Sequence, residues 1–180
     1  SIRENTRLLN VPVKNILSRF QYKAAFNKIV SLDSIYHFPE KELFFSHCYQ
    51  ILSTNPYDGD ALLGKVGVTD LVLKVQDVQK VPLWLRLALS AMNISVTNLW
   101  NRAAYISKLE HCGFSNVSIK SLGNERVLDK WFPSTFLKYL DYALISADVM
   151  GDERNKCLPR PKIAVIGSGL SGLTAAHLLS

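Results

Sequence analysis

The last nineteen residues of the chain, Lys162 to Ser180, constrain its fold more than any other stretch. They read KIAVIGSGLSGLTAAHLLS, and the run from Ile163 to Ile166 predicts a short strand buried on both faces. Three glycines follow at the spacing G-x-G-x-x-G, namely Gly167, Gly169 and Gly172. This spacing permits a tight turn, the close approach of a pyrophosphate and the packing of a helix against the strand.

A helix is expected after this turn. Its apolar residues recur every third position, at Leu170, Leu173, Ala176 and Leu179. The first amides of that helix would point at a phosphate, and Ser168 lies within the same loop. The alternative is a glycine-rich turn that holds no ligand.

The sequence G-S-G-L-S-G-L-T-A-A-H-L-L resembles the N-terminal fingerprint of flavoprotein amine oxidases and phytoene desaturases, which bind FAD through it. The resemblance implies an FAD site at Gly167, Ser168, Gly169 and Gly172. In that family an acidic residue roughly twenty residues further on holds the ribose hydroxyls, and this position lies beyond Ser180. We expect the stretch alone not to bind FAD, because one strand and one helix cannot bury their own apolar faces.

Strand and helix patterns also alternate upstream. A short strand is expected within residues 11–16, and Phe26 to Asp33 predicts a buried strand. Glu40 to Leu52 has helical spacing and is stopped by the turn residues of Asn55 to Asp60. Ala61 to Lys74 predicts the next strand. The order strand, helix, strand implies parallel pairing through a right-handed crossover.

This region resembles the second half of a class I SAM-dependent methyltransferase. The landmarks are the run FNKIVSLDSIYHF from Phe26 to Phe38, the helix that ends with Tyr49 to Leu52, and the run YISKLEHCGF from Tyr105 to Phe114, followed by a predicted strand, Val117 to Leu122. The resemblance covers roughly residues 5–122. It implies an α/β fold, namely an incomplete, Rossmann-like, mostly parallel sheet with flanking helices. The C-terminal βα dinucleotide-binding unit would follow it.

Several positions depart from the family pattern. The glycine-rich first strand and the acid that ends the second strand would lie before Ser1. The acid that accepts from the adenine amino group falls on Asn15, whose carbonyl accepts without charge assistance. The Phe-Asp pair of the family is Phe26-Asn27, and its Pro-Gly-Gly turn is replaced by Asn55 to Asp60. We therefore expect this chain to bind SAM poorly.

The candidate site is the carboxyl end of the strand that ends at Asp33, since ligands of open α/β sheets bind at such ends. The resemblance implies that Asp33 and Ser34, with Asn15, lie on the SAM side, and that Tyr36 and His37 are catalytic. His37 could act as a general base, because histidine titrates near neutral pH. The alternatives are a histidine packed at a helix start and, for Asp33, a cap on the next helix.

The composition is ordinary for a soluble globular protein, with 48% hydrophobic and 20% charged residues and a net charge of +6. Six basic residues and one acid lie between Ser1 and Val30. A second basic cluster consists of Arg154, Lys156, Arg160 and Lys162. They are not interleaved with aromatic residues in a recognisable module, so we expect solvated faces and no nucleic-acid partner. The longest apolar stretch, Val81 to Val96, is too short to span a bilayer.

Three cysteines, Cys48, Cys112 and Cys157, are far apart, which indicates reduced thiols in a cytoplasmic protein. Two His-Cys doublets, at 47–48 and 111–112, lack the C-x-x-C spacing of a zinc site, so no metal is expected. No serine lies in a G-x-S-x-G elbow.

Two further segments have helical spacing. Val81 to Asn98 predicts a helix that packs in the core or, as an insertion of the methyltransferase family, covers an apolar acceptor. Trp131 to Leu144 predicts an amphipathic helix with Pro133 in its first turn. The boundaries implied are a methyltransferase-like region at 1–148, a linker rich in charge and proline at 149–161, and the truncated FAD/NAD(P)-binding unit at 162–180.

The leading hypothesis is a fragment of a fused enzyme, in which part of a SAM-dependent methyltransferase for a small or lipid-like acceptor precedes an FAD-dependent oxidoreductase. One alternative is an amine oxidase-like oxidoreductase whose methyltransferase-like region is a degenerate scaffold. A second alternative is an α/β interaction module without catalytic activity.

Overall fold

A computed structural model describes residue 26 and residues 28–53, 64–122, 133–149 and 163–166. The expectations for residues 11–16, for Asn15, for the turn at 55–60, for the linker and for the glycine-rich segment after Ile166 lie outside these residues. Helices and strands alternate along the described chain, in the order β1 (Lys28–Ser31), η3 (Ile35–His37), α2 (Lys41–Ser53), β2 (Gly64–Leu73), η4 (Val78–Lys80), α3 (Leu83–Ala91), η5 (Val96–Asn98), α4 (Arg102–His111), β3 (Ser115–Ser121), η6 (Phe136–Lys138), β4 (Leu140–Val149) and β5 (Ile163–Ile166).

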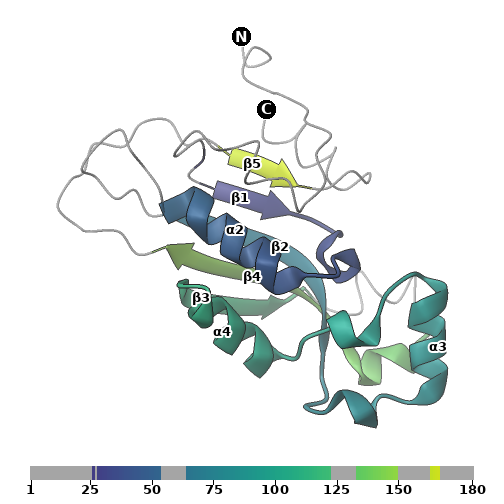
Figure 1. The fold of residues 1–180 in the computed structure, drawn as a ribbon. Coiled ribbons are helices and arrows are strands. Elements are labelled where there is room, and N and C mark those ends of the chain that lie inside the picture. Colours follow the sequence, from purple (N-terminus) through teal and green to yellow (C-terminus); the bar gives the residue numbers. More distant parts are fainter. Residues whose placement is uncertain (1–25, 27, 54–63, 123–132, 150–162, 167–180) are drawn as a thin grey trace.

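The described strands form one sheet in the order β3-β4-β2-β1-β5 (Figure 1). The β1–β2 and β1–β5 pairs are parallel, whereas the β2–β4 and β3–β4 pairs are antiparallel. Only β4 runs against the others, so most strands do point the same way, but half of these pairings are antiparallel. The expected mostly parallel sheet is therefore a mixed sheet. The parallel β1–β2 pair, with α2 as its crossover, agrees with the prediction.

Among the described strands, β5 is the last of the sheet and lies beside β1. Its four residues pair in register with β1, so that Lys28 is opposite Ile163 and Ser31 is opposite Ile166. The strand predicted before the glycine-rich turn thus exists and belongs to the same sheet as β1 and β2. Because the two strands are parallel, the carboxyl ends of β5 and β1 lie at the same end of the sheet.

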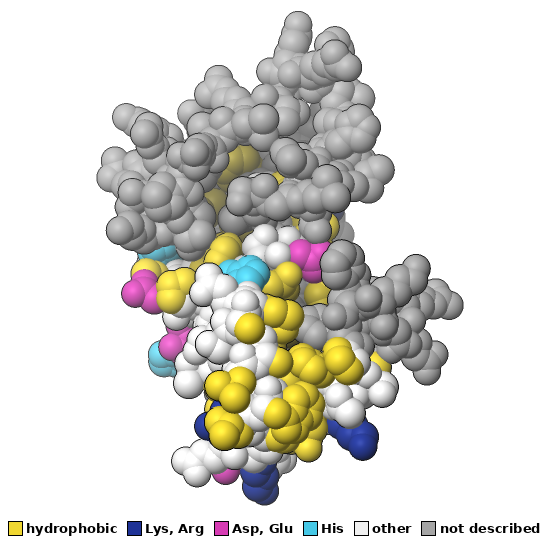
Figure 2. All heavy atoms as spheres, turned by 90° about the vertical axis from the view of Figure 1, so that its right-hand side faces the viewer, with side chains coloured by type: hydrophobic (Ala, Val, Ile, Leu, Met, Phe, Trp, Pro, Cys, Tyr) yellow, Lys and Arg dark blue, Asp and Glu magenta, His cyan; other side chains and the backbone are white. Residues whose placement is uncertain are grey.

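The helix α3 lies at one end of the sheet and forms a second, smaller hydrophobic cluster with the segments around it (Figure 1). Leu85 and Leu89 of this helix are fully buried there. Other large side chains of the same segment, Leu83, Trp84 and Leu87, are exposed, and Figure 2 shows hydrophobic side chains gathered on this face. The expectation that the aromatic and aliphatic residues of 81–98 pack in the core is therefore correct for only some of them.

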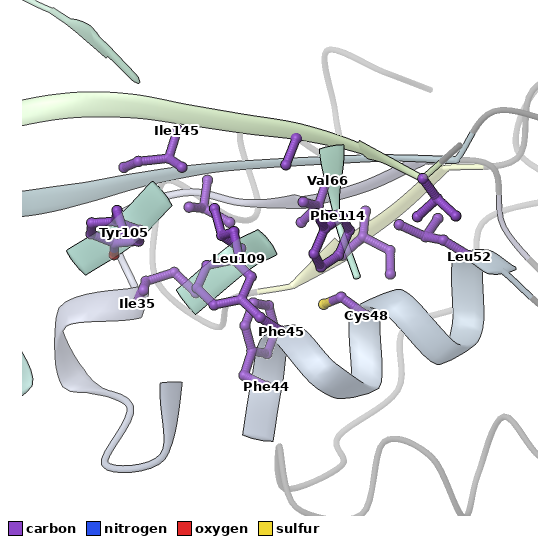
Figure 3. Packing of buried hydrophobic residues seen from close by; sticks show 14 of the residues in the cluster. Ile35, Phe44, Phe45, Cys48, Leu52, Val66, Tyr105, Leu109, Phe114 and Ile145 are labelled. Carbon is purple, nitrogen blue, oxygen red and sulfur yellow. The ribbon is translucent and has the colours of Figure 1, made fainter. Parts of the chain in front are cut away.

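The main core lies between the sheet and the two helices α2 and α4, which cover the same face (Figure 1). In α2, Phe44, Phe45, Cys48, Ile51 and Leu52 are buried at helical spacing, whereas Leu43, which shares the predicted apolar pattern, is 41% exposed. Figure 3 shows Phe45, Cys48 and Leu52 of α2 between this helix and the strands, near Leu109 of α4. Burying several large side chains in this way is the main stabilising contribution to the fold.

The segment 140–149 is a strand, not the end of a helix. The predicted helix from Trp131 to Leu144 is wrong, since the described part of it contains only the short η6 before β4 begins at Leu140. Ten residues of β4 pair with β2, and others pair with β3. Ala143, Ile145, Ala147 and Val149 alternate into the main core with a period of two. Pairing on both sides overrides the helical spacing of the leucines.

The helix α4 has clear start and stop signals. The Asn101 side chain caps it by accepting from the backbone N–H of Ala104 at 2.8 Å. At its end Gly113 has φ +100°, and Phe114 N donates to the carbonyl of Leu109 at 3.0 Å. This turn leads directly into β3, as the Y-x-x-x-L-x-x-x-G-F pattern predicts. Among the helices of the described residues, none has the length and hydropathy needed to cross a bilayer.

Candidate functional site

Three polar residues, Asp33, Thr69 and Tyr142, meet at the carboxyl end of β1. The Asp33 backbone N–H donates to Thr69 Oγ1 at 2.9 Å, and the Tyr142 hydroxyl donates to Asp33 Oδ1. The Tyr142 and Thr69 hydroxyl oxygens are 2.9 Å apart. Because the single proton of Tyr142 is used by the carboxylate, the Thr69 hydroxyl is the donor in this last contact. A closed ring of hydrogen bonds therefore fixes Asp33.

The backbone at Asp33 is unusual. Its φ is +50°, a conformation that residues other than glycine rarely adopt, although aspartate does so more readily than most. Asp33 is exposed, whereas Thr69 and Tyr142 are buried. The following short helix η3 has Ser34 as its N-cap residue without a side-chain capping bond, and Ser34 Oγ donates to the Leu32 carbonyl at 2.8 Å. The N-cap position of η3 is thus Ser34, whereas the Asp33 side chain accepts from the Tyr142 hydroxyl.

Tyr36 and His37 lie one turn further on, in η3. Their rings contact edge to face, with centroids 4.5 Å apart. His37 is exposed, and its Nδ1 lies 3.2 Å from the backbone carbonyl of Asn93, directly beyond α3. The Asn98 side chain donates to the carbonyls of Tyr36 and Phe38. The end of β1 is thereby joined to the segment around α3.

The Tyr36 hydroxyl lies in an environment that disfavours its ionised form. Burial raises its pKa to about 12, and the negative charges of Asp33 and Asp70 act in the same direction. The folded state therefore holds this proton more tightly than the unfolded state. The stabilising effect is complete below the ordinary tyrosine value near pH 10 and is lost as pH rises toward 12.

We expect wild type to lose thermal stability faster than Tyr36→Phe as pH rises from about 10 to about 12. The measurement is Tm by circular dichroism for both proteins across this range. Their difference at pH 8 serves as the baseline, because the phenol is neutral there in both states. If the Tm values of the two proteins fell in parallel with pH, the raised pKa of Tyr36 would be contradicted.

A second polar cluster lies on the other face of β2, inside the main core. Lys41 Nζ and the Tyr105 hydroxyl both donate to Asp70 Oδ2, and the Leu71 backbone N–H donates to Asp70 Oδ1 at 2.8 Å. The Lys41 and Asp70 side chains are fully buried. The ammonium also lies 5.5 Å from the centre of the Trp100 ring.

Burial dominates the ionisation of this buried pair. It lowers the pKa of Lys41 and raises the pKa of Asp70, in each case against the attraction of the partner. Burial likewise raises the pKa of Tyr105, and the Asp70 charge adds to this. Since the Lys41 and Asp70 side chains are both fully buried, we assign the cluster to stability rather than to the candidate site.

The site residues predicted from the sequence are thus only partly brought together. Asp33, Ser34, Tyr36 and His37 are close in space because they are close in sequence. Thr69, Tyr142, Asn93 and Asn98 were not predicted. Thr69 alone had a usable signal, because it lies near the carboxyl half of the strand predicted next to Phe26–Asp33. Tyr142 lay in a segment predicted to be a helix, and 109 residues separate it from Asp33.

Within the described ranges, no group of three or more His, Cys, Asp or Glu side chains is arranged to hold a metal ion. Cys48 is fully buried, and burial raises the pKa of its thiol. A shallow depression of about 320 Å³ lies elsewhere, beside the Arg102–Asp141 ion pair. It does not adjoin Asp33 or His37.

Solved structures share this fold. The phosphoethanolamine N-methyltransferase 2 of Haemonchus contortus, bound to S-adenosyl-L-methionine, is 14% identical with a TM-score of 0.52, over 72% of this chain and 34% of that one. An arsenic(III) S-adenosylmethionine methyltransferase of Chlamydomonas reinhardtii is 11% identical with a TM-score of 0.50, over 82% and 44%. The 4+2 cyclase SpnF is 12% identical with a TM-score of 0.51, over 79% and 55%.

These identities show a common fold and no more. The chain spans between about a third and about half of the length of these three proteins. No protein-family model matches the sequence, and no curated protein matches it significantly. Because a cyclase shares the fold with two methyltransferases, the fold alone does not decide the reaction.

Proposed function

We propose that this chain is part of a SAM-dependent methyltransferase that acts on a small or lipid-like acceptor. The observation that carries the proposal is the fixed carboxylate of Asp33 at the carboxyl edge of β1, within a fold shared with SAM-dependent methyltransferases. Ligands of such sheets bind at this edge. When bound, SAM supplies an electrophilic methyl group, and the protein contributes mainly by positioning.

Asp33 and Ser34 would contact the SAM side of the site, together with Asn15. The ring of hydrogen bonds through Thr69 and Tyr142 supports this role for Asp33, because it holds an exposed carboxylate in one orientation. Preorganised acceptors lose less entropy when a ligand binds.

His37 would act as the general base for the acceptor, with Tyr36 beside it. The carbonyl of Asn93 only accepts hydrogen bonds, so the neutral His37 ring carries its proton on Nδ1. Nε2 is then the basic nitrogen, able to take a proton from an acceptor hydroxyl or amine. The same contact places His37 beside the end of α3, whose exposed apolar side chains favour an acceptor with apolar parts.

A second candidate function is an FAD-dependent oxidoreductase in which the methyltransferase-like region is a scaffold. The pairing of β5 with β1 favours it, because β5 ends at the same end of the sheet as β1, and Gly167 is the next residue of the sequence after β5. In dinucleotide-binding sheets the glycine-rich turn follows a strand of this kind. Gly167, Ser168, Gly169 and Gly172 would then hold the pyrophosphate. A non-catalytic interaction module remains the third candidate.

The test uses the full-length protein that contains this chain. We expect it to transfer tritium from methyl-labelled SAM to an acceptor pool, and we expect Asp33→Asn to weaken the binding of S-adenosylhomocysteine about tenfold, the loss typical of one charged hydrogen bond. Asp148→Asn is the matched control, because Asp148 lies in β4 and pairs with Lys65 away from Asp33.

Absence of both methyl transfer and S-adenosylhomocysteine binding would refute the methyltransferase proposal. A bound flavin spectrum in that same preparation would support the oxidoreductase instead. Failure to bind SAM, FAD and NAD in a thermal-shift screen would favour the interaction module. For the 180-residue chain alone, we expect only weak SAM binding, and micromolar affinity by calorimetry would contradict this expectation.

A further inference from the structure

The helix α3 is apolar on both of its faces. Leu85 and Leu89 are buried, yet Leu83 is 72% exposed and Leu87, one turn further on, is 62% exposed. Trp84 and Met92 add exposed fractions of 44% and 37%. Large apolar side chains grouped on the exposed side of one helix are typical of an interaction surface. The outer face of α3 is therefore prepared for a partner.

This outer face differs from the other exposed apolar positions of the described residues. Leu43 on α2 and Ile106 on α4 are isolated, and single exposed apolar residues are normal on protein surfaces. Leu83, Trp84 and Leu87 instead follow one another on α3, and Met92 is its C-cap residue. Figure 2 shows hydrophobic side chains gathered on this face. We call Leu83, Trp84, Leu87 and Met92 the α3 patch.

The α3 patch is held rigidly from beneath. Trp84 contacts Phe136 and Tyr139 edge to face, with ring centroids 5.3 and 6.2 Å apart. Arg86, the one charged residue of the helix, donates to the carbonyls of Val78 and Val81 at 2.8 and 3.0 Å. These contacts fix the helix on the body of the protein and leave its apolar side chains facing outward.

The segments that flank α3 carry more basic than acidic residues. The described residues of this region, 74–99 and 133–139, contain four basic residues, Lys74, Lys80, Arg86 and Lys138, and one acid, Asp77. Asp77 is occupied as the cap of η4, where it accepts from Gln79 N at 2.8 Å. Lys138 lies in η6, which contacts Trp84 through Phe136, and Lys74 Nζ donates to the Leu137 carbonyl at 2.6 Å. These flanking segments therefore carry a net positive charge, and we call their basic residues the basic rim.

We propose that the α3 patch docks onto the surface of an anionic lipid bilayer. Leucine and tryptophan on one face, with lysine and arginine around them, are the composition of a helix that lies in the membrane interface. The exposed part of the patch is on the order of 400 Å², about half of what each partner buries in a stable protein complex. A bilayer needs no such matching surface, and anionic lipid headgroups complement the basic rim.

This docking stands on the geometry of α3 and does not depend on the reaction that the protein catalyses. It would hold equally for the methyltransferase, for the oxidoreductase and for a non-catalytic module. If methyl transfer to a lipid-like acceptor is confirmed, docking at α3 would bring the acceptor close to His37, since Asn93 beyond α3 contacts that residue.

The test is co-sedimentation of the 180-residue chain with sucrose-loaded vesicles, either of phosphatidylcholine alone or of an equimolar mixture with phosphatidylserine. We expect binding to the anionic vesicles to exceed binding to the neutral ones and to weaken with added salt. Leu87→Glu should lower the partition coefficient for anionic vesicles at least tenfold. Ile106→Glu, on the unrelated face of α4, is the matched control and should leave it unchanged.

A second readout identifies the surface that is in contact. Brominated lipids quench tryptophan fluorescence at short range, so quenching of wild type should be largely lost in Trp84→Phe. Binding that survives Leu87→Glu, or quenching that survives Trp84→Phe, would overturn the proposal and place the contact on another basic part of the chain. A concentration-dependent dimer that Leu87→Glu abolishes, without vesicle binding, would assign the patch to a second copy of the chain and would also overturn it.

Discussion

Asp70→Asn is expected to destabilise the folded chain by about 3–5 kcal/mol, the typical cost of removing one partner from a buried ion pair. The substitution leaves the Lys41 ammonium inside the main core without a counter-charge, since both side chains are fully buried. Asp70 is the group that offsets the effect of burial on Lys41, so the pKa of Lys41 falls further without it. Urea unfolding at neutral pH measures the free-energy difference.

Two variants test whether the uncompensated buried charge of Lys41 causes this loss of stability. Lys41→Met combined with Asp70→Asn should be less destabilised than Asp70→Asn alone, because no uncompensated charge remains in the core. Glu42→Gln removes one partner of the Lys108–Glu42 pair, whose side chains are 35% and 55% exposed, and should cost less than about 1 kcal/mol. Equal effects of Asp70→Asn and Glu42→Gln would show that burial is not the cause.

Gly113→Ala is expected to destabilise the chain by about 2–4 kcal/mol, through backbone strain and overpacking together. Gly113 has φ +100° at the end of α4, a conformation that residues with a side chain adopt only under strain. An added Cβ would also lie 2.6 Å from Cζ of Tyr49, well inside van der Waals contact. The same urea unfolding experiment provides the measurement.

The chain offers a matched control in β2. An added Cβ at Gly67 would meet nothing within 4 Å, so Gly67→Ala should be neutral or slightly stabilising. Gly113→Ala with Tyr49→Leu separates the two causes, because the smaller side chain relieves the clash and leaves the strain. If the Gly113→Ala protein were as stable as the Gly67→Ala protein, the proposed strain and overpacking at residue 113 would be contradicted.

The resemblance to methyltransferases explains why the first part of the site was predictable. Asp33, Ser34, Tyr36 and His37 follow a strand within a few residues, and chain connectivity alone places them at its carboxyl end. What holds Asp33 in place was not predictable in the same way. Tyr142 reaches it from β4, and the contact exists only because β4 is inserted next to β2.

The wrong prediction of a helix at residues 131–144 also arises because contacts distant in the sequence decide the structure of this segment. The spacing of Phe136, Leu137, Leu140 and Leu144 fits a helix, and local spacing was the only criterion available. Alternation from Ala143 to Val149 was a competing signal, with every second residue apolar. Hydrogen bonds to β2 and β3 decide between the two patterns, and these depend on strands far away in the sequence.

The sequence by itself determined the elements whose signals are local. These are β1, α2, β2, α4 and the strand before the glycine-rich turn. Tertiary structure alone decided that β4 is a strand, that Asp70 and Lys41 pair inside the core, that β5 joins β1, and that half of α3 faces outward. The physical reason is that propensity and periodicity act over a few residues, whereas burial, strand pairing and ion pairing depend on neighbours that only the folded chain brings together.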